Sequence, residues 1–227
     1  MNPTDPKKLA GPGEAPSGAP PRAEGAAEAT LRARWDEGDI DGAATEAIRV
    51  YGPEIYGLLL SLHPRGGDAD DLFSIVCERL WRGLAGFRWQ CSVRTWAYAI
   101  ARNASRSHGE AEGRRARREV GLSACPAVSE VAAAVRTETA SYLRTERRAE
   151  IERLRDELPA ADRALLILRL DRGLAWNDLA RVFLDDPGAG DEAVRREAAR
   201  LRKRFQLVRE RLVALGRARG LLGDGGG

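Results

Sequence analysis

The chain has 227 residues, enough for one or two domains that each bury an apolar core of their own. Its 37 basic and 34 acidic residues leave a net charge of only +3, so the total charge points to no particular class of partner. No apolar run approaches the roughly 20 residues needed to cross a bilayer, and the N-terminal residues lack the layout of a secretory signal. We therefore expect a cytoplasmic protein that does not associate with membranes.

The residues that usually carry metal binding or catalysis are few and scattered. Cys77, Cys91 and Cys125 lie far apart in the sequence, and neither histidine stands at a metal-ligand spacing from any of them. The sequence has no glycine-rich phosphate loop and no recognisable pair of nucleophile and base. It therefore predicts no metal, no cofactor and no enzymatic activity.

The N-terminal part predicts a tail followed by a helical domain. Residues 1–29 are rich in Pro, Gly, Ala and Glu, a composition that predicts disorder. The first domain is expected over residues 30–110. Within it, residues 43–50 and 53–63 are expected to form two helices, the second with a proline in its first turn, where proline is tolerated.

Two further helices, separated by an aromatic loop, complete the first predicted domain. Asp68 is a good N-cap for a helix that runs to about Leu84 with one apolar stripe. A loop over residues 87–92 follows, and the apolar spacing then predicts a helix from Val93. Aromatic side chains interleaved with arginines, as in this segment, suit the binding of unstacked bases next to phosphates.

The C-terminal half predicts a second helical domain on a tether. Residues 111–148 show no sustained periodicity and are too many for a structureless loop inside one compact domain, so we expect a flexible linker. Residues 149–219 contain short helices and then a long one with Asp191 as its expected N-cap, and residues 220–227 form a glycine-rich tail. Helix, turn and long basic helix in this order predict a helix-turn-helix.

The charge is polarised onto the last predicted helix. Residues 194–219 hold ten basic against two acidic side chains, a surplus of +8, whereas residues 149–193 hold six basic and eleven acidic ones, a balance of −5. A solvated charged face is the alternative interpretation. The single sign of the surplus and its position directly after a helix-turn signal favour DNA binding.

Two groups of short motifs follow one another along the chain. The first group is DDL at 70–72, ERLWR at 78–82 and RTWAYAIARN at 94–103, and the second is LP at 158–159, LAWNDLA at 174–180 and RLRKRF at 200–205. With these motifs, the chain resembles a bacterial RNA polymerase sigma factor of the extracytoplasmic-function (ECF) group of the sigma-70 family. The first group matches region two of the family and the second matches region four, and the resemblance covers about residues 43–110 and 149–215. The acidic turn over residues 184–193 is longer than in the family, which leaves open the register at which the last helix meets DNA.

The resemblance implies an all-α fold of two small helical domains, a region-two bundle and a region-four helix-turn-helix, joined by a flexible linker. It also implies a transcription initiation factor that binds the β′ clamp helices and the β flap of core RNA polymerase. Such a factor recognises the −35 and −10 elements of promoter DNA and helps to melt the −10 DNA. Members of the group are often held by an anti-sigma factor, although nothing in this sequence identifies one.

The resemblance further implies three sets of site residues. The residues implied to bind polymerase are Asp70, Asp71, Leu72, Phe73, Arg79, Leu80 and Trp81. The residues implied to contact the −10 DNA are Phe87, Arg88, Trp89, Gln90, Ser92, Arg94, Trp96, Tyr98, Arg102 and Asn103. The residues implied to contact the −35 DNA are Arg195, Arg196, Glu197, Arg200, Lys203 and Arg204.

Structural interpretations of several of these residues stay open. They are core packing for Trp81 and Trp96, a charged helix start for Asp70 and Asp71, and a C-terminal cap for Asn103. For the chain as a whole, the alternative function is a stand-alone helix-turn-helix regulator that binds duplex DNA without polymerase.

Overall fold

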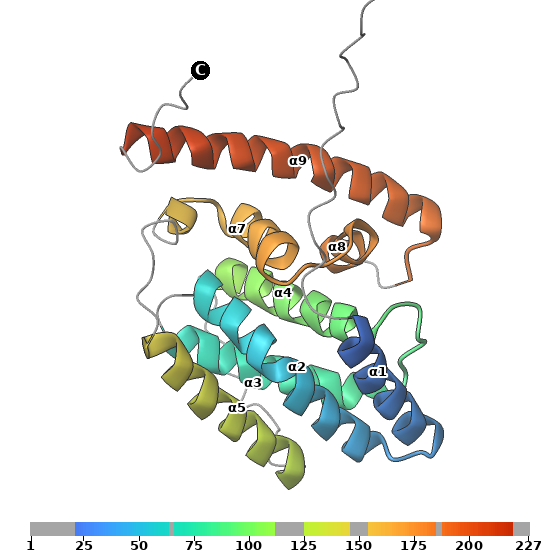
Figure 1. The fold of residues 1–227 in the computed structure, drawn as a ribbon. Coiled ribbons are helices and arrows are strands. Elements are labelled where there is room, and N and C mark those ends of the chain that lie inside the picture. Colours follow the sequence, from blue (N-terminus) through green and yellow to red (C-terminus); the bar gives the residue numbers. More distant parts are fainter. Residues whose placement is uncertain (1–20, 64–65, 112–124, 146–153, 185–187, 220–227) are drawn as a thin grey trace, which may run out of the picture.

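In the computed structural model, the described residues are 21–63, 66–111, 125–145, 154–184 and 188–219. Every regular element within these ranges is a helix, which confirms the predicted all-α fold (Figure 1). None of the helices in these ranges combines the length and apolar character needed to span a bilayer. The predicted tail over residues 1–20, the C-terminal tail and parts of the predicted linker lie outside the described residues.

α1 (Pro21–Asp36) begins inside the segment that the composition predicts to be disordered. The prediction of a disordered tail was therefore wrong for residues 21–29. The helix is rich in alanine and other good helix formers. It is held by only a few apolar side chains, of which Leu31 is fully buried, while Ala27 and Trp35 pack at the edge of the core. An apolar stripe of so few residues cannot be recognised from the amino-acid composition of the segment.

α2 (Ile40–Leu62) is one continuous helix where the sequence predicts two. Pro53 lies inside it and removes one backbone hydrogen bond of the helix. The proline ring is exposed, whereas Tyr51 and Ile55 on either side are buried. Burial of a continuous apolar face therefore outweighs the lost bond, and the prediction of a break at this position was wrong.

α3 (Gly66–Leu84) and α4 (Val93–Ala111) pack against α2 and each other to form the first helical unit. α5 (Pro126–Thr145) adds to this unit, although the sequence predicts a flexible linker there. Its buried residues Val128, Ala132 and Val135 are spaced by four and three, and it packs along α2. Gly52 permits this close approach, because a Cβ atom there would lie 3.2 Å from both methyl groups of Val135.

The second helical unit contains α7 (Ala160–Leu166), the π-helical turn η2 (Ile167–Asp171), α8 (Trp176–Phe183) and α9 (Asp191–Ala218). Gly173, with a φ of 68°, lies directly after the C-cap of η2. α9 packs on α7 and α8 through its apolar stripe. Its N-cap is Gly190, so the prediction of Asp191 as the cap was wrong; Asp191 is the first residue of the helix.

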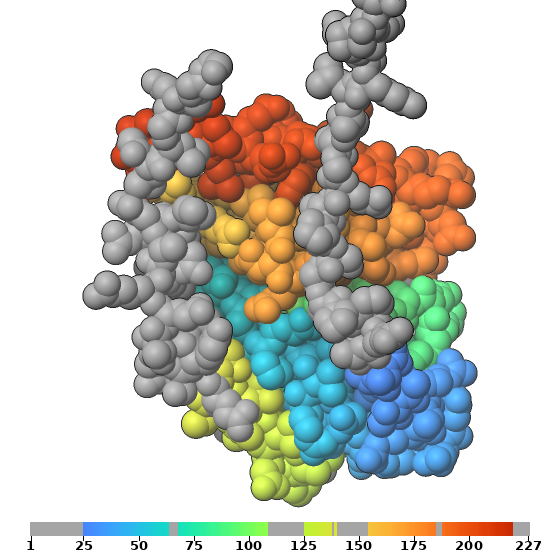
Figure 2. Space-filling view, in the orientation of Figure 1, coloured from blue at the N-terminus to red at the C-terminus, as the bar shows by residue number. Residues whose placement is uncertain are grey.

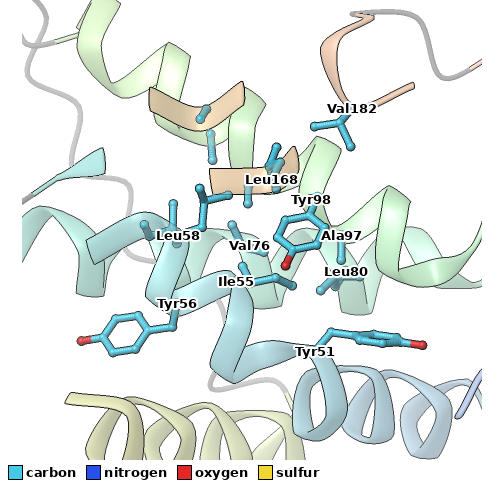
Figure 3. Close-up of a cluster of buried hydrophobic side chains, with 14 of the residues drawn as sticks. Tyr51, Ile55, Tyr56, Leu58, Val76, Leu80, Ala97, Tyr98, Leu168 and Val182 are labelled. Carbon is cyan, nitrogen blue, oxygen red and sulfur yellow. The ribbon is translucent and has the colours of Figure 1, made fainter. Parts of the chain in front are cut away.

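The two helical units pack directly against each other, with α4 lying against α8 (Figure 1). In the space-filling view the orange and red second unit rests on the blue and green first unit (Figure 2). Leu168 and Val182 of the second unit belong to the same buried cluster as Ala97 and Tyr98 of α4 (Figure 3). The two predicted helical units are therefore both present, and they lie in contact with each other in this structure.

A buried arginine adds a polar connection between the units. Arg163 of α7 is only 9% exposed, and its Nη1 atom donates a hydrogen bond of 2.8 Å to the backbone carbonyl of Ser61 in α2. Its Nη2 atom donates to the carbonyls of Asp156 and Leu158 within its own unit. A guanidinium buried with this set of acceptors fixes the position of one unit relative to the other.

The contact between α4 and α8 also buries a carboxylate. Asp178 of α8 accepts a hydrogen bond from Thr95 of α4, with Arg181 and Arg94 nearby. Burial is the largest influence and raises the pKa of Asp178 above its ordinary value of 3.8, although the hydrogen bond and both arginines lower it. The folded, closed protein therefore holds this proton more tightly than the unfolded chain does. Stability contributed by the protonated form is lost as the pH rises through this raised pKa.

Asp178→Asn should raise the melting temperature at pH 7 and flatten its dependence on pH above 3.8, the ordinary pKa of the carboxyl group. The amide oxygen still accepts the bond from Thr95 but carries no charge to desolvate. Thermal unfolding followed by circular dichroism across this range measures the effect. Asp191→Asn is the matched control, because Asp191 also faces Arg181 but is 84% exposed. A melting temperature that falls in Asp178→Asn would contradict this account of the interface.

Candidate nucleic-acid interface

The loop between α3 and α4 gathers aromatic side chains into one cluster. Phe87 stacks on Trp96 with ring centroids 4.7 Å apart, and Trp89 tilts against Phe87 at 5.1 Å. Trp89 has a φ of 55°, a strained conformation that bulky side chains rarely adopt, and strained residues cluster at functional sites. Its indole nitrogen is buried, and no described residue accepts its hydrogen bond.

α1 holds this loop at both ends. Trp35 Nε1 donates a hydrogen bond of 2.8 Å to the carbonyl of Leu84, the last residue of α3. The carboxylate of Glu28 accepts hydrogen bonds from the backbone N–H groups of Val93 and Arg94, the first two residues of α4. Sequence reasoning missed the role of Glu28, because it lies in the segment whose composition predicts disorder.

A third α1 residue reaches the loop itself. The guanidinium group of Arg32 lies 4.7 Å from the ring centroid of Trp89 and 5.3 Å from that of Trp35. The rings of Trp35 and Trp89 meet edge to face at 5.9 Å. The guanidinium group of Arg32 thus lies against two aromatic rings beside the loop, and a combination of arginine and aromatic rings suits stacking on bases.

Three other residues predicted to contact the −10 DNA have different surroundings. Arg88 and Gln90 lie in the loop, outside any helix, and are exposed. Ser92 caps α4, since its hydroxyl oxygen accepts a hydrogen bond of 3.0 Å from the backbone N–H of Thr95. The structure therefore gives Ser92 a role in ending the loop.

Arg94, Tyr98 and Arg102 face the second helical unit. Arg94 pairs through two nitrogens with Glu54, at 2.7 and 2.9 Å, and also donates to the carbonyl of Arg172. Arg102 stacks over Phe183 of α8 at 4.3 Å. Tyr98 is completely buried, which raises the pKa of its hydroxyl. The expectation that these side chains lie open for DNA is corrected, because α8 and its preceding turn cover this side of α4.

The structure also decides between interpretations of Trp96 and Asn103. Trp96 is half-buried and packs over Gly83, where a Cβ atom would come within 2.9 Å of the indole. Trp96 thus belongs to the packing of α3 against α4. α4 continues to Ala111, so Asn103 lies inside the helix and the interpretation as a C-terminal cap was wrong.

The residues predicted to bind polymerase divide into a buried and an exposed set. Leu72, Phe73 and Leu80 are at most 2% exposed and form part of the core, so their predicted place on a contact surface is corrected. The exposed set on α3 is Asp70, Asp71 and Arg79.

Two of the polymerase-binding candidates also have partners inside the first unit. The half-buried Trp81 donates a hydrogen bond of 2.6 Å from Nε1 to Asp41. The carboxylate of Asp70 accepts a hydrogen bond from the hydroxyl of Tyr56. Asp70 therefore carries a negative charge near the start of α3 and also links α3 to α2 through this hydrogen bond.

α9 presents most of its predicted DNA-binding residues to solvent. The exposed ones are Arg195, Arg196, Arg200 and Lys203. Glu197 holds Arg200 through two hydrogen bonds of 2.8 Å, and this pairing raises the pKa of the guanidinium. Arg204 is half-buried and bonds Asp162 of α7 at 2.6 Å, so in this structure it contacts its own unit, and its contact with DNA stays a prediction.

The cysteines show no sign of metal or redox chemistry in the described residues. Burial raises the pKa of Cys77 to about 12 and that of Cys91 to about 11, so both are thiols rather than thiolates at neutral pH. Within the same ranges, no three side chains of His, Cys, Asp or Glu gather in a group that could hold a metal ion.

Two comparisons with known proteins indicate the family to which this chain is similar. Residues 47–115, from α2 through α4, match the family model of sigma-70 region 2. The chain is also similar to the RNA polymerase sigma-H factor of Pseudomonas aeruginosa, with 27% identity over 177 residues that cover 72% of this chain and 86% of that protein. An aromatic loop and an arginine-bearing helix inside the region-2 match, followed by an exposed basic helix, thus support an RNA polymerase sigma factor of the sigma-70 family.

Proposed function

We propose that this chain is an ECF-type sigma factor that binds core RNA polymerase, directs it to promoters by reading the −35 and −10 elements, and helps to melt the −10 DNA. The aromatic loop between α3 and α4 is the observation that carries the proposal. It combines the positive φ of Trp89, a buried indole N–H without an acceptor among the described residues, and a neighbouring guanidinium. A flipped base stacked on such a surface gains roughly 1–3 kcal/mol.

Polymerase binding is proposed for the exposed side of α3. Asp71 and Arg79 lie on that side, while the apolar residues of the helix are used in the core. The contact with the β′ clamp helices would therefore be mostly polar, with Trp81 as its half-buried apolar part. The chain has no catalytic role in this proposal, because RNA synthesis belongs to the polymerase.

Reading of the −35 element is proposed for the N-terminal half of α9. Arg195 and Arg196 are exposed, the latter with an exposed pairing to Glu192, and Lys203 lies two turns further along the helix. α9 lies on the side of the second unit opposite the first unit, and these side chains are exposed, so duplex binding requires no rearrangement (Figure 1). The alternative function, a stand-alone regulator of duplex DNA, is favoured by the same observation.

Binding of the non-template DNA strand by α4, in contrast, requires the two helical units to separate. Arg94 and Arg102 contact residues 172 and 183 of the second unit, and these contacts occupy the groups proposed to hold the non-template strand. We infer that binding to polymerase pulls α8 away from α4. A free chain would then have a weak affinity for single-stranded DNA.

Reconstitution with sigma-free core polymerase separates the two functions. The purified chain should direct transcription from a DNA pool with randomised −35 and −10 elements, and Asp71→Lys should weaken its association with core at least tenfold. Charge reversal there places a cation where the proposed contact needs an anion. Glu37→Lys, on the exposed turn after α1, is the matched control. A chain that binds duplex DNA but yields no transcript at any start site would establish the regulator instead.

The combined substitution of Arg195, Arg196 and Arg200 by alanine should weaken duplex binding and lower the slope of log Kd against log salt by about 3, roughly one for each lost phosphate contact. Arg209, Arg211 and Arg217 are on the same helix and exposed, so their replacement is a control with the same loss of charge. Fluorescence anisotropy with a duplex recovered from the transcription pool gives the slope. Equal slopes for both triple variants would place the DNA surface elsewhere.

A further inference from the structure

Glu28 of α1 caps the N-terminus of α4 from a different helix. Its Oε2 atom accepts a hydrogen bond of 3.1 Å from the N–H of Val93, and its Oε1 atom one of 3.2 Å from the N–H of Arg94. The first N–H groups of a helix have no partner within the helix, and a carboxylate there also complements the positive end of the helix dipole. Glu28 therefore holds the first two N–H groups of α4.

The position of this carboxylate is itself fixed. The hydroxyl of Tyr51 in α2 donates a hydrogen bond of 2.9 Å to Oε1 of Glu28. Tyr51 is only 3% exposed, so the donor is anchored in the core of the first unit. Ser92 binds the next N–H, that of Thr95. The start of α4 is thus held by the core through Glu28 and by the loop through Ser92.

The opposite end of the loop is held by the same helix. Trp35, seven residues after Glu28 and on the same face of α1, bonds the last carbonyl of α3. Arg32, one turn after Glu28, stacks on Trp89 in the middle of the loop. α1 therefore spans the loop from the end of α3 to the beginning of α4 and contacts it in between.

We propose that Glu28 is a positioning residue for promoter melting: it holds the first turn of α4 so that the half-buried Trp89, packed on the buried ring of Phe87, keeps its place in the loop that meets the unpaired −10 strand. This inference rests on the proposed function and adds to it a residue that need not touch DNA. Glu28 acts through the backbone of α4, and the loop between two fixed ends keeps one conformation. Release of one end would let the loop populate many conformations, few of which accept a base.

The test compares Glu28→Ala and Glu28→Gln with the parent chain in reconstituted transcription. The templates are a promoter recovered from the transcription pool and the same promoter made non-complementary across its −10 element. Loss of a capping side chain should lower open-complex formation on the duplex roughly fivefold in Glu28→Ala. Glu28→Gln keeps one acceptor oxygen and should fall in between. On the pre-melted template both variants should come within about twofold of the parent chain.

Controls separate positioning from folding and from the proposed function. Glu37→Gln removes the same charge outside the loop contacts and should behave as the parent chain does on both templates. Tyr51→Phe, which removes the donor that orients Glu28, should reproduce the loss on duplex DNA without altering the side chain of Glu28 itself. Core association, measured in parallel, should stay within twofold for every variant.

Two results would overturn the inference: full activity of Glu28→Ala on the duplex promoter, or an equal loss on duplex and pre-melted templates, which indicates only a structural role. Failure of the proposed function has a different signature, because the parent chain itself would then give no transcript from either template.

Discussion

The placement of α4 is the constraint on which the rest of this structure depends. Its buried side packs on α2 and α3, its first turn is capped by Glu28 of α1, and its remaining side lies against α8. One helix therefore connects the core, the aromatic loop and the second unit. Any change in the position of α4 relative to α3 changes the loop that joins them, which explains why so many contacts converge on its first turn.

The closed arrangement of the two helical units gives the same arginines two uses. Arg94 and Arg102 pair with Glu54 and stack on Phe183 in the closed chain. In the proposed function they hold a DNA strand in the open one. A guanidinium group suits both, since it forms bidentate pairs with carboxylates and phosphates and also stacks on rings. The closed chain thus satisfies these groups internally, and α9 remains open to duplex DNA.

The regular apolar spacing in the sequence correctly predicts α3, α4, α8 and α9, and the exposed basic face of α9 follows from the same pattern. Propensity and composition failed where tertiary contacts decide. Pro53 remains in a helix because buried residues flank it, and α5 is helical because Val128 and Val135 pack on α2. The composition of residues 21–29 resembles that of disordered chains, yet Leu31 and Trp35 anchor the helix that contains them.

The candidate site was predicted in outline but not in its burial. A periodic pattern places Arg94, Tyr98 and Arg102 on a helix, yet it does not show that another unit covers them. Capping of α4 by Glu28 joins residues 65 positions apart in the sequence, and nothing local predicts it. The exposure of Arg88 and Gln90 in the loop and of Arg195 and Arg196 on α9 was easier to predict, because it follows from the local sequence and not from a distant partner.

Closure of the free chain and its opening on polymerase form the central claim, and a distance measurement tests it most directly. Fluorescent labels at Val50 on α2 and Leu207 on α9, both exposed, would report on the separation of the two units by energy transfer. The account predicts high transfer efficiency in the free chain and a large decrease when sigma-free core polymerase is added. Low efficiency in the free chain, or an unchanged efficiency in the complex with core, would contradict it.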